Sequence, residues 1–215
     1  KGNGNSFVNN IQEKAEATHC FRFVSLFINF QANKFTFSNN PGILCTESEG
    51  YQMNITFQGN PVTIKHEAVK ENETLKPFTV IRNDMSEWRS EDSTGTRIFL
   101  SVPSLDTGVC SMEVAKFINY AKELKDVTVC AISMDLPFAL ERWCQAKNNE
   151  NVITLSDYKL HSFAAATATY VEELGLLTRA VFVVDKDNIL RYVEYVREIT
   201  DEPDYEAVLS CVKGI

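Results

Sequence analysis

Apolar residues follow two periods along residues 53–215, one typical of strands and one typical of helices. Continuous apolar or β-branched runs predict strands, several of them buried on both faces. These runs alternate with segments whose apolar residues recur every three or four positions, which is typical of an α/β protein. The predicted strands are 54–57, 62–64, 78–81, 97–102, 127–133, 180–185 and 189–196. The predicted helices are 111–124, 137–146, 163–174 and 204–212.

Two pairs of neighbouring strands are predicted to form hairpins. A Gly59-Asn60 turn joins the first two strands, and an Asp187-Asn188 turn joins the last two. Strands 97–102 and 127–133, by contrast, are each followed by a helix. If these two strands are parallel, both helices begin at the same edge of the sheet.

The junction between strand 97–102 and helix 111–124 carries the candidate chemistry. Its sequence, PSLDTGVC, runs from Pro103 to Cys110. Pro103 lacks a backbone N–H and ends the strand, so Cys110 falls in the first turn of the helix. There the unpaired N–H groups and the positive end of the helix dipole favour a thiolate over a thiol. This position predicts a cysteine nucleophile suited to peroxide.

A fast peroxidase also needs groups that hold the peroxide and meet the charge developing on its leaving oxygen. The Thr107 hydroxyl, three residues before Cys110, can donate to the peroxide or accept from it. Pro103 can shield the thiolate from water. The alternative is that Thr107 caps the helix and Pro103 only ends the strand. The residues alone leave both interpretations open.

Six motifs spread over residues 53–215 give the chain a resemblance to bacterial thiol peroxidases, the atypical two-cysteine branch of the peroxiredoxins. They are FQGNPVT (57–63), PSLDTGVC (103–110), SMDLPFALERWC (133–144), VITLSDY (152–158), LLTRAVFVVD (176–185) and EITDEPDYEAVL (198–209). Their order and spacing carry the resemblance. A thioredoxin-like fold, with a central mixed β-sheet flanked by helices and a short N-terminal β-hairpin, fits both the motifs and the pattern of elements.

The resemblance implies roles for five residues. Cys110 is the peroxidatic cysteine, with Thr107 and Pro103 shaping its pocket, and Cys144 is the resolving cysteine. Arg179 matches the arginine that stabilises the thiolate and polarises the peroxide, a role suited to a planar donor that is always charged. Without the motif around it, Arg179 is better interpreted as one half of an ion pair at a strand end.

The implied reaction reduces hydrogen peroxide and alkyl hydroperoxides, with thioredoxin as the reductant. Cys110 becomes a sulfenic acid, and Cys144 condenses with it to form an intrachain disulfide. The resemblance also implies a homodimer, and neither a metal nor an organic cofactor is expected. The alternative function is a redox sensor or relay in which Cys110 passes its oxidation to partner proteins. The presence of Cys144 favours the peroxidase, because an internal thiol competes with transfer to partners.

The spacing of Cys144 predicts where it lies relative to Cys110. Pro137 suits the first turn of its helix, and Cys144 follows seven residues later, about 10 Å along the axis. A disulfide requires Cα atoms within about 7 Å. We therefore expect the two cysteines to be apart when reduced, and local unfolding to bring them together.

Two features of the matched region depart from the family pattern. The segment FAAATATYVEELGLL lacks the glycine- and proline-bearing loop that usually precedes the arginine motif, and we expect a shorter or more helical connection there. Trp143 replaces a smaller aromatic residue. Near the reactive cysteine, the apolar residues Leu105, Val109 and Phe138 favour alkyl hydroperoxides as substrates, unless they belong to the core.

Composition narrows the function classes. The 215 residues carry a net charge of −8, which argues against nucleic acid as a partner. Of the six cysteines, only Cys110 and Cys144 are expected to cycle, in the reducing cytoplasm. Cys130 lies in an apolar strand and is predicted to be a core residue, while Cys211 falls on the C-terminal helix. The histidines at 19, 66 and 161 lie in unrelated segments, so a zinc site is not expected and each is predicted at the surface.

Residues 1–52 match none of the family motifs. Their apolar run, 20–30, contains an arginine and is too short to span a bilayer, so no membrane association is predicted. Acidic residues stand where a signal peptide needs basic ones. We expect an unassigned extension, either disordered or translated from upstream sequence with Met53 as the natural start, in which Cys20 and Cys45 have no function. A short β-extension or a partner-binding arm is the alternative.

Overall fold

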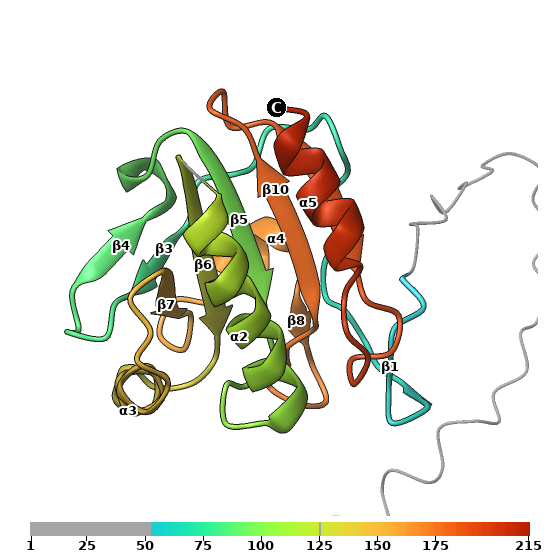
Figure 1. Ribbon diagram of the computed structural model, residues 1–215. Helices are drawn as coiled ribbons and strands as arrows, with labels where there is room; N and C mark the ends of the chain where they lie inside the picture. Colours follow the sequence, from blue (N-terminus) through green and yellow to red (C-terminus); the bar gives the residue numbers. More distant parts are fainter. Residues whose placement is uncertain (1–52, 125) are drawn as a thin grey trace, which may run out of the picture. The chain divides into compact units, whose positions relative to one another are not determined.

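A mixed sheet of seven strands organises residues 53–124 and 126–215, the part of the chain that the computed structural model describes (Figure 1). Its strands are β3 (Thr79–Ile81), β4 (Glu87–Arg89), β5 (Thr96–Ser101), β6 (Val127–Ser133), β7 (Val152–Ser156), β10 (Ala180–Val184) and β11 (Leu190–Tyr195). Their spatial order is β11-β10-β5-β6-β7-β3-β4. Strands β5, β6 and β7 pair in parallel. Every other pair of neighbouring strands in this sheet is antiparallel. The predicted α/β fold with a central mixed sheet is confirmed. The expectations for residues 1–52, including Cys20, Cys45 and His19, lie outside the described residues.

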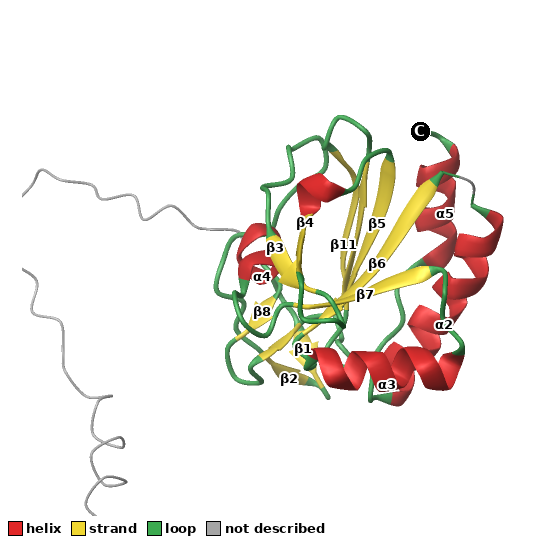
Figure 2. Cartoon of the chain, turned by 90° about the vertical axis from the view of Figure 1, so that its left-hand side faces the viewer, coloured by secondary structure: helices red, strands yellow, loops and turns green. Residues whose placement is uncertain are grey.

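Helices cover both faces of this sheet. They are α2 (Gly108–Glu123), α3 (Pro137–Lys147), α4 (Ser162–Thr167) and α5 (Tyr205–Lys213), with a 3₁₀ turn, η2, at Ser90–Asp92. Figure 2 shows α2 and α5 on one side of the sheet and α4 on the other. Helix α3 joins α2 and α5 in the same hydrophobic cluster through Leu140 and Trp143. The described part of the chain therefore has three layers, with the sheet in the middle.

The central strands are buried on both faces, as their continuous apolar runs predict. Because side chains alternate along a strand, Phe99 and Phe182 face the cluster that contains Phe163 of α4. Ile98 and Val181 face the opposite cluster, which contains residues of α2, α3 and α5. Strands β5 and β6 are parallel, as predicted, and are followed by α2 and α3. Both helices therefore begin at the same edge of the sheet.

The N-terminal hairpin is present, but its position differs from the prediction. It pairs β1 (Thr56–Phe57) with β2 (Asn60–Pro61). The two-residue turn is Gln58-Gly59. Its φ angles are 51° and 77°, and two-residue hairpin turns of type I′ require positive φ at both positions. The strand predicted at 62–64 is wrong, because Ile64 makes only an isolated bridge to Val171. The hairpin predicted at Asp187-Asn188 is confirmed by the pairing of β10 with β11.

The helix predicted at 163–174 is wrong beyond its first half. Helix α4 ends at Thr167, whose hydroxyl donates to the Phe163 carbonyl, and Ala168 takes a left-handed φ of 52°. The chain then forms a hairpin of β8 (Tyr170–Val171) and β9 (Leu176–Leu177), turning near Gly175 at φ 63°. This hairpin stands where a shorter or more helical connection was expected. Strands β4 and β7 were also missing from the prediction.

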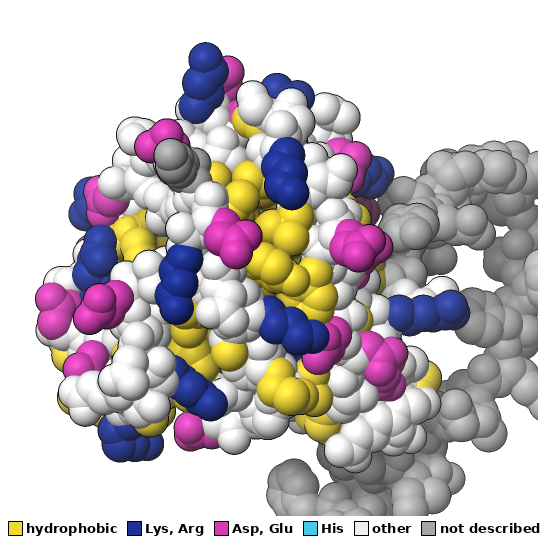
Figure 3. Space-filling view, in the orientation of Figure 1, with side chains coloured by type: hydrophobic (Ala, Val, Ile, Leu, Met, Phe, Trp, Pro, Cys, Tyr) yellow, Lys and Arg dark blue, Asp and Glu magenta, His cyan; other side chains and the backbone are white. Residues whose placement is uncertain are grey.

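The surface of the face that carries α2 and α5 mixes lysine and arginine with aspartate and glutamate, and apolar atoms lie between them (Figure 3). Among residues 53–124 and 126–215, no helix has both the length and the apolar character needed to cross a membrane.

Candidate active site

The loop between β5 and α2 is fixed by a carboxylate from the next loop along the sheet edge. Asp135, which follows β6, accepts hydrogen bonds from Ser104 Oγ at 2.7 Å and from the Leu105 N–H at 2.8 Å. It also accepts from Ser133 Oγ at 2.9 Å. Pro103 is buried at the start of this loop. The two loops that follow parallel strands are thus tied together at the edge where α2 begins.

Thr107 is the N-cap residue of α2, but its hydroxyl does not cap the helix. Its backbone is extended, with φ −95° and ψ 149°, and the side chain makes no capping hydrogen bond. Thr107 Oγ1 instead donates to the Ser104 carbonyl at 2.9 Å, and the side chain is exposed. Thr107 therefore begins the helix through its backbone alone, and its hydroxyl lies at the surface.

Cys110 lies in the first turn of α2, as predicted, and is only 1% exposed. Arg179, just before β10, donates through Nη2 to Cys110 Sγ at 3.2 Å. Its Nε donates to the Ile199 carbonyl at 2.9 Å, and its Nη1 pairs with Glu113 Oε2. Two contacts therefore hold the guanidinium against the sulfur of Cys110, which lies 69 residues away in sequence. The structure brings Cys110 and Arg179 together as the motif implied, and the alternative ion pair of Arg179 is also present.

Glu113 belongs to this site as well, although no motif in the sequence points to it. It lies one turn after Cys110 on α2, and it is fully buried. Burial raises the pKa of Glu113 to about 7, although the Arg179 charge opposes that rise. Its second oxygen, Oε1, has no hydrogen-bond partner among the described residues. Burial disfavours the charge on Arg179 as well, but the charges of Glu113 and Cys110 outweigh it and raise the pKa of Arg179.

The raised pKa of Glu113 predicts a pH dependence of stability. The unfolded chain loses this proton near pH 4.5 and the folded chain near pH 7, so ionisation favours the unfolded chain in between. The unmodified protein should therefore lose about 2 kcal/mol of unfolding free energy, relative to Glu113→Gln, between about pH 5 and pH 8. Urea unfolding of the reduced proteins at both pH values measures this difference. Parallel pH profiles for the two proteins would contradict the prediction.

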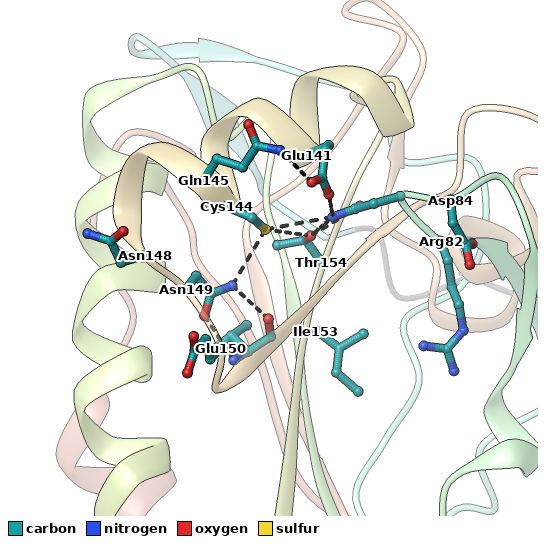
Figure 4. Close-up of a pocket in the computed structure, with 12 residues that line it drawn as sticks. Arg82, Asp84, Glu141, Cys144, Gln145, Asn148, Asn149, Glu150, Ile153 and Thr154 are labelled. Carbon is teal, nitrogen blue, oxygen red and sulfur yellow. Dashed lines mark hydrogen bonds between the residues drawn. The ribbon is translucent and has the colours of Figure 1, made fainter.

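Cys144 lies on α3, in a polar cavity of about 590 Å³ that also holds Asn83, Asn149 and Thr154 (Figure 4). Its sulfur is half-buried and lies 3.1 Å from Thr154 Oγ1. The preceding residue, Trp143, donates from its indole to Ser111 Oγ at 3.0 Å, which joins α3 to the turn that carries Cys110. Pro137 is the first residue of α3, as predicted.

Cys110 and Cys144 are both free thiols. Among the described residues, no side chain hydrogen-bonds both sulfurs: Arg179 contacts the first, and Asn83, Asn149 and Thr154 contact the second. The two sulfurs are therefore not bonded to each other, and different groups hold them. The local unfolding that would join them stays a prediction.

The other described cysteines and histidines lie outside the site. Burial raises the pKa of the Cys130 thiol to about 12, which agrees with its predicted place in the core. Cys211 is half-buried on α5. His66 and His161 are exposed, as predicted.

Comparisons with known proteins identify the family. The redoxin family model matches residues 70–209. Two curated relatives are thiol peroxidases: the one from Clostridium acetobutylicum is 42% identical over 162 residues, covering 75% of this chain and 99% of the relative. The one from Oceanobacillus iheyensis is 45% identical over 158 residues, covering 73% and 96%. A solved structure, a peroxiredoxin-like protein from Aquifex aeolicus, is 34% identical with a TM-score of 0.70, covering 77% and 99%.

The chain therefore belongs to the redoxin family. Its relatives and its fold make it a thiol-dependent peroxidase with a thioredoxin-like core, and they do not favour the alternative of a redox relay.

Proposed function

We propose that this protein reduces hydrogen peroxide and alkyl hydroperoxides through Cys110, forms a Cys110–Cys144 disulfide, and is recycled by thioredoxin. The observation that carries the proposal is the hydrogen bond from Arg179 to the buried Cys110 sulfur in the first turn of α2. A guanidinium and a helix N-terminus together favour the thiolate, which is the reactive form.

The first step is attack of the Cys110 thiolate on one oxygen of the peroxide. An S–O bond forms, the O–O bond breaks, and the leaving oxygen departs with its electron pair and takes up a proton as water or an alcohol. The products are that molecule and a Cys110 sulfenic acid. Arg179 meets the negative charge that moves from sulfur to the leaving oxygen. Pro103 excludes water from the sulfur, and the Thr107 hydroxyl positions the peroxide at the entrance.

The second step joins the two cysteines. The Cys144 thiolate attacks the Cys110 sulfur, an S–S bond forms, and the hydroxyl group leaves as water after taking a proton. An external dithiol then supplies two electrons and two protons to restore both thiols. Thioredoxin is the reductant implied by the family resemblance, and the reducing cytoplasm and a homodimer belong to the same proposal.

The substrate range rests on the apolar residues around this loop. Leu105 is only 2% exposed and packs in the core, so it belongs to the fold. Phe138, in the first turn of α3, is 60% exposed and Val109 is half-buried. These two side chains offer an apolar surface to an alkyl hydroperoxide near the start of α2.

Cys144→Ser tests the two-cysteine mechanism. We expect steady-state turnover with thioredoxin to fall at least about tenfold, because the sulfenic acid can no longer be resolved within the chain. The first oxidation of Cys110 by one equivalent of peroxide should keep its rate. Stopped-flow tryptophan fluorescence follows the oxidation, and peptide mass mapping of the unmodified protein should find the Cys110–Cys144 disulfide. Unchanged turnover in Cys144→Ser would contradict the mechanism.

A further inference from the structure

The side chain of Asn83 connects two elements that are distant in sequence. It lies in the turn between β3 and β4, 61 residues before Cys144. Its Nδ2 is 3.0 Å from Thr154 Oγ1 on β7, 3.3 Å from Glu141 Oε2 on α3 and 3.7 Å from Cys144 Sγ. One amide therefore joins the β3–β4 turn to both the helix and the strand beneath it.

Two further polar groups reach the same sulfur (Figure 4). The Thr154 hydroxyl lies 3.1 Å from Cys144 Sγ and 3.2 Å from Asn83 Oδ1, so it can exchange hydrogen bonds with both. Asn149 Nδ2 lies 3.6 Å from the sulfur and also donates to the Val152 carbonyl at 2.7 Å. We call Asn83, Asn149 and Thr154 the Cys144 clasp.

The groups that hold the two sulfurs come from different parts of the sheet. The Cys110 sulfur is bound by Arg179, which precedes β10, whereas Thr154 belongs to β7. Strands β5 and β6 lie between β10 and β7, so at the usual strand spacing these two strands are about 14 Å apart. A disulfide bond is only about 2 Å long. On the proposed mechanism, Cys144 therefore moves from the clasp toward Cys110 when the bond forms.

We propose that Asn83, Thr154 and Asn149 are positioning residues that hold the resolving cysteine in its reduced place and set the rate of disulfide formation. The inference rests on the proposed role of Cys144. The clasp stabilises the reduced conformation of the C-terminal part of α3, and its contacts are absent once the S–S bond forms. It therefore prolongs the sulfenic acid at Cys110 and leaves it open to a second peroxide, which would yield a sulfinic acid and water.

Asn83→Ala and Thr154→Val in the full-length protein test the clasp. After one equivalent of peroxide, we expect disulfide formation to be about fivefold faster, the effect of losing one neutral hydrogen bond. The rate of Cys110 oxidation should not change. The equilibrium constant with a reference dithiol should move about fivefold toward the disulfide, equivalent to about 20 mV for two electrons. Acid quench, alkylation and mass spectrometry give the rates.

Two matched variants separate this role from a general effect on the fold. Thr154→Ser keeps the hydroxyl and should retain the unmodified rate, and Glu150→Gln changes the lining of the same cavity without touching the sulfur. A purely structural role would destabilise the reduced and disulfide forms alike, whereas loss of the clasp should destabilise only the reduced form in thermal unfolding.

Equal or slower disulfide formation in both Asn83→Ala and Thr154→Val would overturn the proposed role of the clasp. Absence of a Cys110–Cys144 disulfide in the unmodified protein would overturn the proposed function, and the clasp with it.

Discussion

Cys110→Ser should abolish peroxide-dependent turnover, with a loss of roughly a thousandfold or more. A serine hydroxyl beside Arg179 stays protonated near neutral pH and is a poor nucleophile toward an O–O bond, whereas a thiolate is a strong one. The volume of the side chain hardly changes, so the buried site should stay folded. Following NADPH oxidation with thioredoxin and thioredoxin reductase measures the loss.

Cys211→Ser is the matched control for this experiment. Cys211 is half-buried on α5, and burial raises the pKa of its thiol, so it should contribute nothing to turnover. The Cys211→Ser protein should therefore keep the unmodified rate. Residual turnover in Cys110→Ser above that of the thioredoxin system alone would mean that another cysteine reacts with peroxide, and the proposed mechanism would fail.

The parts of the fold that could be predicted are those whose pattern is local. β5, β6 and β10 are continuous apolar runs, and their burial on both faces follows from that. The segment after Phe163 has the composition of a helix, yet α4 stops because Ala168 adopts a left-handed backbone and the following residues pair as a hairpin. That outcome depends on pairing across a turn, which helical spacing does not reveal.

In the candidate site, too, the residues with a local motif were predicted and those that depend on distant contacts were not. The motif around Cys110 predicted the helix N-terminus, and the resemblance predicted Arg179 as its partner. Glu113 was not predicted, because a glutamate on an amphipathic helix ordinarily faces water, and only the packing of Arg179 against it explains its burial. Asn83 was not predicted either, since the turn that carries it contacts α3 only in the folded chain. The roles of both residues depend on contacts between segments that are distant in sequence, which a local sequence pattern does not reveal.

Arg179→Lys should lower kcat/KM for peroxide about 100-fold, which corresponds to about 3 kcal/mol of transition-state stabilisation. Lysine keeps the charge, but a single ammonium group cannot donate along the fixed directions that reach the Ile199 carbonyl, Glu113 and Cys110 together. The second-order rate of Cys110 oxidation, measured by stopped-flow fluorescence, reports this loss without the later steps. A rate within threefold of the unmodified protein would contradict the role of the guanidinium.

Removing the charge altogether requires a second substitution, because Glu113 would be left buried without its partner. Arg179→Gln alone should therefore lose stability as well as activity, by about 3 kcal/mol near pH 8, because without the Arg179 charge the pKa of Glu113 rises further and folding must either protonate this carboxylate or bury it unpaired. The double variant Arg179→Gln, Glu113→Gln replaces the ion pair with two neutral amides and should recover most of that stability in urea unfolding. Its oxidation rate should stay as low as that of Arg179→Gln. Recovery of stability without recovery of rate would separate the two effects of Arg179: its charge neutralises a buried carboxylate, and its Nη2 acts on the sulfur. Recovery of both would mean that the arginine serves the fold alone.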